Sequence, residues 1–114
     1  MTKEIYLMTK NKGKILAARN IFSKFGIEVK NIEKEYPEIQ ANTSLEIAKQ
    51  TAEEASRDFN VPVVHEDHSL FINALGGFPG PYTSYFDKTV PAKKILELMK
   101  NKKDRKGYFE IAAA

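Results

Sequence analysis

The chain has 114 residues, of which 42% are hydrophobic and 29% are charged, and it contains no cysteine. This length and composition are typical of one globular unit with one core, so we expect a single domain over residues 1–114. The absence of cysteine excludes disulfides and thiolate metal sites. Because the sequence also lacks a signal peptide and any apolar stretch that could span a bilayer, we predict a cytoplasmic protein without a membrane partner.

The net charge is +3, and much of the positive charge gathers in residues 93–106. A basic segment of this kind can bind nucleic acid. No aromatic residue interleaves it before Tyr108, however, and lysines near helix ends usually face water. We therefore predict a solvated face and no nucleic-acid partner.

The first predicted elements are a strand over residues 5–9, a helix that ends at Gly26, and a strand over residues 27–32. The first strand is continuously apolar, which favours a central position in a sheet. The helix is indicated by apolar residues at helical spacing, which are Ile15, Ala18, Phe22 and Phe25.

The turn between the first strand and this helix carries Thr9, Asn11 and Lys14. Backbone N–H groups at the start of a helix favour phosphate, and a lysine adds positive charge there. The same spacing also suits ordinary capping of the helix by Thr9 or Asn11. The residues alone leave both interpretations open.

A polar loop over residues 33–40 precedes a second helix, which begins with the capping-box pattern of Thr43 and Glu46 and ends at Asn60. We expect its inner face to consist of Leu45, Ala48, Ala52, Ala55 and Phe59. The small alanines imply close packing against a sheet. The order of strands and helices predicts an α/β fold with a mixed central sheet and flanking helices.

A short buried strand over residues 63–64 leads into two adjacent carboxylates, Glu66 and Asp67. Parallel strands present functional groups at their carboxyl ends. An apolar run follows, and then a loop over residues 76–81 with three glycines and two prolines. Such a loop is stiff at proline and lets a ligand come close at glycine. Together these features predict a metal and a phosphate-bearing ligand.

The remaining residues predict a short connection over residues 83–87, a helix that starts near Pro91, and a strand from Tyr108 to Ala112. We expect Ile95, Leu98 and Met99 to face inward. This last strand has no turn or polar tail after it, so we expect an incomplete C-terminal end. Among the aromatic residues, those expected in the core are Phe22, Phe25, Phe59 and Phe71, and those expected near a base or a partner subunit are Phe78, Tyr82 and Tyr85.

Four segments taken in order, residues 9–14, 36–40, 66–67 and 74–82, resemble the Ham1-type inosine/xanthosine triphosphate pyrophosphatase family. The resemblance covers nearly the whole chain, and its most specific part is Leu-Gly-Gly-x-Pro-Gly-x-Tyr. It implies an elongated α/β fold and commonly a homodimer. It also implies magnesium-dependent hydrolysis of ITP, XTP and dITP to the monophosphate and pyrophosphate.

The resemblance further implies roles for individual side chains. Glu38, Glu66 and Asp67 would serve the magnesium ion, and Asp67 would also orient or deprotonate the attacking water. Lys14 would offset charge on the leaving pyrophosphate. The residues expected to bind substrate are Thr9, Asn11, Lys14, His68, Gly77 and Gly80.

The chain departs from the family pattern at several positions. His68 and Ser69 stand where a small Ser-Gly pair is usual, Thr51 replaces a helix lysine, and Ala17 replaces a glutamate. Family members also continue into a second lobe that helps recognise the base. An alternative function is therefore a non-catalytic relative that binds nucleotide or acts as an oligomerising scaffold.

A second alternative is a transition-metal site built on residues 65–68. Strand alternation would place His65 and Asp67 on one face and Glu66 and His68 on the other. All four could bind one ion only if the strand bent there. An ordinary hydrogen-bonded or exposed histidine is the simpler interpretation.

Overall fold

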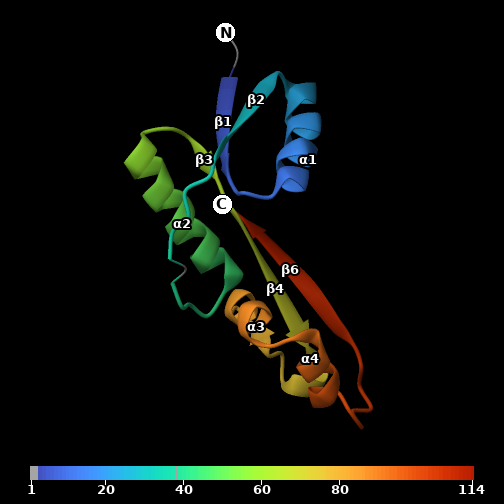
Figure 1. Ribbon diagram of the computed structural model, residues 1–114. Helices are drawn as coiled ribbons and strands as arrows, with labels where there is room; N and C mark the ends of the chain where they lie inside the picture. The colour runs from blue at the N-terminus through green and yellow to red at the C-terminus, as the bar shows by residue number, and fades with distance from the viewer. Residues whose placement is uncertain (1–2, 38) are drawn as a thin grey trace.

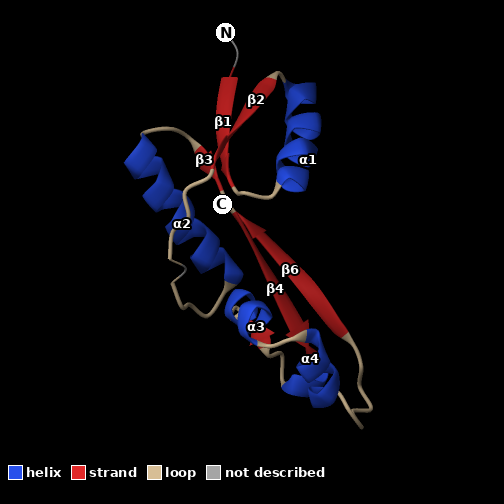
Figure 2. Cartoon of the chain, in the orientation of Figure 1, coloured by secondary structure: helices blue, strands red, loops and turns tan. Residues whose placement is uncertain are grey.

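The computed structural model describes residues 3–37 and 39–114. The molecule is elongated, with extents of 58 × 27 × 20 Å. Two three-stranded sheets lie end to end, and helices cover them (Figures 1 and 2). The expected α/β fold and elongated shape are confirmed, and the mixed sheet is divided into a parallel part and an antiparallel part. Within the described residues, no helix has the length and apolar character needed to cross a membrane.

The first sheet is parallel and has the order β2-β1-β3, with β1 at Lys3–Met8, β2 at Ile27–Ile32 and β3 at Val63–Val64. Alternation along β1 turns Leu7 and Met8 to opposite faces. Leu7 packs with Ile15 of helix α1 (Lys12–Phe22), and Met8 packs with Ala55 of helix α2 (Ser44–Phe59). Each face of the sheet therefore has its own helix and its own part of the core.

The ends of these two helices follow from local chemistry. Helix α1 is extended by a 3-10 turn at Ser23–Phe25 and stops at Gly26, whose φ of 70° is readily adopted only by glycine. The hydroxyl of Thr43 accepts a hydrogen bond of 3.2 Å from the backbone N–H of Glu46 at the start of α2. Asn60 closes α2 in the left-handed conformation. These boundaries agree with the sequence prediction.

The predicted inner face of α2 is partly wrong. Leu45 and Phe59 are 55% and 44% exposed, whereas Ile47 is almost fully buried. The buried stripe is Ser44, Ile47, Ala48, Thr51, Ala52 and Ala55. This is the spacing of three and four residues that one helical face requires, and Leu45 lies outside it. Phe59, four residues after Ala55, continues the stripe but is the last residue of the helix and is exposed there.

The second sheet is antiparallel and has the order β5-β4-β6, with β4 at Glu66–Ile72, β5 at Pro79–Gly80 and β6 at Gly107–Ala113. Only His65 separates β3 from β4. His65 and Ala114 exchange two backbone hydrogen bonds of 2.9 Å, which extend the ladder to the end of β3. The rings of Phe71 and Tyr108 stack across the ladder at 4.8 Å. One nearly continuous strand thus belongs to both sheets.

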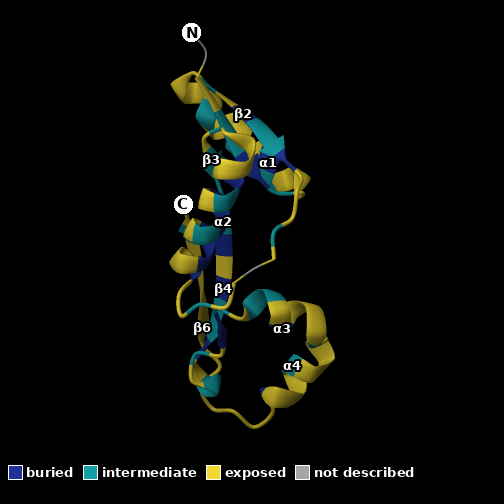
Figure 3. Cartoon of the chain, turned by 90° about the vertical axis from the view of Figure 1, so that its left-hand side faces the viewer, coloured by how far each residue is buried: buried dark blue, intermediate teal, exposed yellow. Residues whose placement is uncertain are grey.

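Residues 83–87, predicted as a connection, belong to helix α3 (Thr83–Thr89), so that prediction is wrong. Phe86 anchors this helix, since it is buried and meets the edge of Phe78 at 5.3 Å. Helix α4 (Ala92–Leu98) follows. Most of α3 and α4 is exposed, as Figure 3 shows.

Two further burial predictions fail. Phe25 is 73% exposed and, like Phe59, does not lie in the core, and Leu98 of α4 is 45% exposed. Met99 is buried as expected. Each misplaced residue stands at or near the end of its helix, where few neighbouring elements remain to cover it.

The hydroxyl groups of Ser44 and Ser69 form a hydrogen bond between α2 and β4, and both side chains are fully buried. We expect Ser69→Ala to lower the free energy of unfolding by about 1–3 kcal/mol, because it leaves the Ser44 hydroxyl buried without its partner. The double variant with Ser44→Ala should cost less than the sum of the two single variants.

Urea denaturation measures these values, with Ser23→Ala, an exposed serine, as the control expected to change stability by no more than about 0.5 kcal/mol. Additive effects of the two buried substitutions would contradict the coupling.

Candidate functional site

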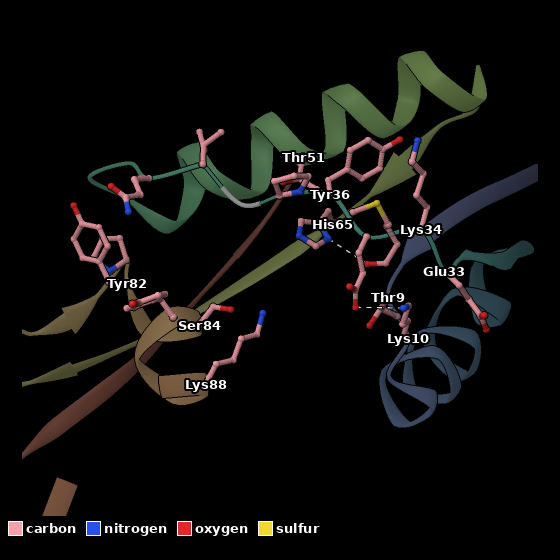
Figure 4. Close-up of a pocket in the computed structure, with 17 residues that line it drawn as sticks. Thr9, Lys10, Glu33, Lys34, Tyr36, Thr51, His65, Tyr82, Ser84 and Lys88 are labelled. Atoms are coloured by element: carbon pink, nitrogen blue, oxygen red, sulfur yellow. Dashed lines mark hydrogen bonds and ion pairs between the residues drawn. The ribbon is translucent and has the colours of Figure 1, made fainter. Parts of the chain in front are cut away.

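A cleft of about 690 Å³ opens where the three parallel strands end (Figure 4). Thr9 and Lys10 follow β1, residues 33–37 follow β2, and His65 follows β3, and all of them line the cleft. The carboxyl ends of parallel strands are where open α/β sheets bind their ligands. The opposite wall comes from α3 and the loop before it, with Tyr82, Ser84, Tyr85 and Lys88 among its residues. Thr51 of α2 also lines the cleft.

Hydrogen bonds fix the floor of this cleft. The backbone N–H of Thr9 donates to the carbonyl of Ile32 at 3.2 Å, which continues the pairing of β1 and β2. The Nδ1 atom of His65 lies 3.2 Å from the carbonyl oxygen of Met8. The residues after β1, β2 and β3 are thereby held beside each other.

The predicted phosphate turn at residues 9–14 serves as a helix cap. The Asn11 side-chain oxygen accepts hydrogen bonds from the backbone N–H groups of Gly13 at 2.9 Å and Lys14 at 3.2 Å. The N–H of Asn11 donates to the Thr9 hydroxyl at 3.1 Å. Thr9 lines the cleft, whereas Asn11 and Lys14 lie outside its lining. The capping interpretation is present in the structure, and phosphate binding at Asn11 and Lys14 stays a prediction.

The two adjacent carboxylates point to different sides of β4. Asp67 is 7% exposed and shares its face with Ser69, which contacts α2. Glu66 lies on the other face, and its carboxylate is 3.4 Å from the Nε2 atom of His68. Asp67 is therefore enclosed between β4 and α2, two residues from His65 on the cleft floor.

The structure shows how far the expected metal set comes together. Glu38 lies outside the described residues. Within residues 3–37 and 39–114, no three or more histidine, aspartate or glutamate side chains are grouped so that they could hold a metal ion. Magnesium usually joins one or two carboxylates to substrate phosphates and water, so a single buried acid such as Asp67 is a suitable donor of this kind. Glu66, on the opposite face, is not placed beside it.

The glycine-rich segment forms a tight turn, and of its residues only Pro81 lines the cleft. Gly80 has a φ of 50°, and a Cβ atom there would lie 3.1 Å from the Phe71 ring and 3.3 Å from the carbonyl of Gly77. The hydroxyl of Thr83 accepts from the backbone N–H of Leu70 at 2.8 Å and donates to the carbonyl of Gly80 at 2.6 Å. The turn is thus fastened to β4, and it places Tyr82 at the cleft, while Gly77 and Gly80 lie outside the lining.

A polar cluster holds the loop after β2, and sequence reasoning missed it. The Tyr36 hydroxyl donates to Asp58, near the end of α2, at 2.6 Å, and Lys34 lies 3.6 Å from the same carboxylate oxygen. The Lys34 ammonium is also 4.8 Å from the centre of the Tyr36 ring. The hydrogen bond to Asp58 raises the pKa of Tyr36 to about 12, and the same bond lowers the pKa of Asp58 below its ordinary value. Tyr36 lines the cleft, so this cluster fixes part of its wall.

Other cleft residues that the sequence analysis did not assign to a substrate site are Lys10, Lys34, His65, Ser84 and Lys88, of which only His65 had been considered, as part of the alternative transition-metal site. Lys10, Lys34 and His65 come within three residues of the end of a parallel strand. That position was the signal that could have found them. Ser84 and Lys88 gave no such signal, because their helix was not predicted.

Comparison with known proteins gives consistent results. Residues 5–114 match the sequence model of the Ham1 family. A dITP/XTP pyrophosphatase of Methanosarcina mazei is 40% identical over 107 residues, which are 94% of this chain and 58% of that protein. One from Ignicoccus hospitalis is 40% identical over all of this chain and 61% of its own length. The structure of a HAM1 protein from Coxiella burnetii is similar in fold, with a TM-score of 0.83 at 24% identity, over 98% of this chain and 62% of that one. The chain thus spans about three fifths of each of these proteins.

The Tyr36–Asp58 hydrogen bond predicts an unusual titration. Because the folded pKa of Tyr36 exceeds its ordinary value of 10.0, the bond stabilises the fold fully below about pH 10, and this contribution is lost as the pH rises toward about 12. In an ultraviolet absorbance titration, Tyr36 should therefore give an ionisation step near pH 12, above the ordinary value of 10.0.

This high-pH ionisation step should be missing in Tyr36→Phe. It should move toward pH 10 in Asp58→Asn, which removes the carboxylate charge. Tyr82→Phe, at another tyrosine of the cleft, is the control that should keep it. Simultaneous ionisation of all five tyrosines would contradict the assignment.

Proposed function

The chain belongs to the Ham1 family, and from this premise we propose that it hydrolyses the nucleoside triphosphates ITP, XTP and dITP to the monophosphate and pyrophosphate. The observation that supports this most is the cleft at the carboxyl ends of three parallel strands, with a buried acid, Asp67, two residues along the chain from the lining residue His65 and itself outside the lining. The relatives named dITP/XTP pyrophosphatase are consistent with that substrate class. In this proposal the chain acts in the cytoplasm, which its lack of cysteine fits.

The proposed roles follow from position. Thr9 contacts the phosphates from the floor of the cleft, and Lys14, in the first turn of α1, adds positive charge near the leaving group. Asp67 would hold the metal and would position the attacking water or take its proton. When magnesium is bound, it lowers the pKa of that water and neutralises phosphate charge. Tyr82 and Tyr85, which are 42% and 73% exposed, offer rings to the base from the α3 wall.

A second candidate function is a non-catalytic relative that binds nucleotide or assembles as a scaffold. The observation that favours it is the apolar outer face of β6, where Phe109 and Ile111 are 71% and 60% exposed. Exposed apolar surface of this kind promotes association. Self-association, as a homodimer, is compatible with either function. Magnesium-dependent binding of ITP without any product would favour this second candidate.

The test of the proposal is chromatographic analysis of products from ITP and XTP with magnesium, with GTP and ATP as comparison substrates. We expect monophosphate and pyrophosphate in equal amounts from ITP and XTP. Asp67→Asn should lower the rate by about 100-fold or more, because the amide is a poor metal ligand and cannot accept a proton.

The control is Glu97→Gln, which removes an exposed acid of α4 that pairs with Lys94 at 3.2 Å, and it should keep full activity. A wild-type chain that forms no product would contradict the proposed reaction. Unchanged turnover in Asp67→Asn would instead remove this residue from the mechanism.

A further inference from the structure

Three lysines line the cleft, but two of them are neutralised by carboxylates. The Lys10 ammonium lies 3.4 Å from Glu35, and the Lys34 ammonium lies 3.6 Å from Asp58. Lys34 is also held over the Tyr36 ring. Lys88 forms no ion pair with any residue in the described ranges 3–37 and 39–114. Its charge is therefore the one among these three lysines that is not offset locally.

The position of Lys88 suits contact with a ligand. It belongs to α3, and the four-residue spacing from Ser84 places both side chains on the same helical face, toward the cleft. The buried ring of Phe86 fixes the opposite face of α3. Figure 4 shows the Lys88 side chain extending from α3 toward the side of the cleft where Thr9 lies. Glu33, a carboxylate of the lining, lies on that same side, beyond Thr9.

No other described residue of the cleft lining supplies an unpaired positive charge that could replace that of Lys88. Thr51, which α2 presents to the cleft, is neutral and only 4% exposed. Glu33 adds negative charge on the strand side, where Glu35 is already paired with Lys10. A polyphosphate that enters the cleft would therefore be attracted mainly toward the α3 side. A lysine acts there as a flexible point charge that can reach phosphate oxygens.

We propose that Lys88 is a phosphate-binding residue, whose ammonium contacts the triphosphate chain of the nucleotide from the α3 wall of the cleft. This inference rests on the proposed function, because it takes a nucleoside triphosphate as the ligand of this cleft. It makes α3 a second source of phosphate contacts, opposite the floor formed by the ends of the strands.

The test is equilibrium binding in magnesium of an ITP analogue whose α–β bridge is an imido group, which the proposed reaction cannot cleave. Loss of one charge-assisted contact should weaken binding of this analogue to Lys88→Met by about 10-fold or more. Binding of inosine, which has no phosphate, should be unchanged. Lys88→Arg should keep most of the affinity, and the difference between wild type and Lys88→Met should shrink at high salt.

The matched control is Lys93→Met, which removes the same charge from an exposed lysine of α4 outside the cleft lining. It should change the affinity by less than about 2-fold. Thermal unfolding of each variant shows that the fold is intact.

The outcomes separate the two proposals. If wild type binds the analogue and Lys88→Met binds it as tightly as Lys93→Met does, the role of Lys88 is overturned and the proposed function stands. Equal weakening of the analogue and of inosine would also overturn it, because Lys88 would then act on the shape of the cleft. If the wild-type chain binds no analogue, both proposals fail.

Discussion

The structure depends on one strand that changes its partners at a single residue. Before His65, the chain pairs in parallel with β1, and after it the chain pairs antiparallel with β6. His65 itself bonds to Ala114 through its backbone and contacts the carbonyl of Met8 through its ring. Because β3 and β4 run on almost without interruption, the carboxyl ends of the parallel strands and the start of β4 must lie together. The cleft and the buried Asp67 are consequences of that continuity.

The cleft walls differ in what holds them. Lys10 and Glu35 form an exposed ion pair, and pairs of this kind contribute little to stability in water. Tyr36 is different, because its ring packs against the core cluster of Met8, Ile32 and Ala55 while its hydroxyl binds Asp58. The β2 side of the cleft is thus part of the hydrophobic core. The α3 side is anchored mainly by Phe86 and by the Thr83 bridge between β4 and the glycine-rich turn.

The sequence predicted elements best where local signals were strong. The strand at Ile27–Ile32, the cap at Thr43 and the stops at Gly26 and Asn60 depend on neighbouring residues only, and all are confirmed. Helix α3 was missed because its cause is tertiary, the burial of Phe86 against Phe78. The exposure of Leu45 likewise depends on which side of α2 meets the sheet, and that of Phe59 depends on how far the sheet covers the end of α2. In the site, residues that follow parallel strands could be anticipated, whereas the link between Tyr36 and Asp58 joins positions 22 residues apart that no local pattern connects.

The long ladder between β4 and β6 constrains the order in which the two sheets can form during folding. The segment from β1 to β2 closes through a single helix, so its contacts can form soon after it is synthesised. Strand β4 must wait for residues 107–113, which lie beyond two helices, before its outer edge is paired. Distant pairings of this kind form slowly, and an unpaired edge is open to other chains in the meantime. A nascent chain would therefore have an ordered parallel sheet while β4 still had a free edge. A chaperone or a second chain would then bind first at the antiparallel half.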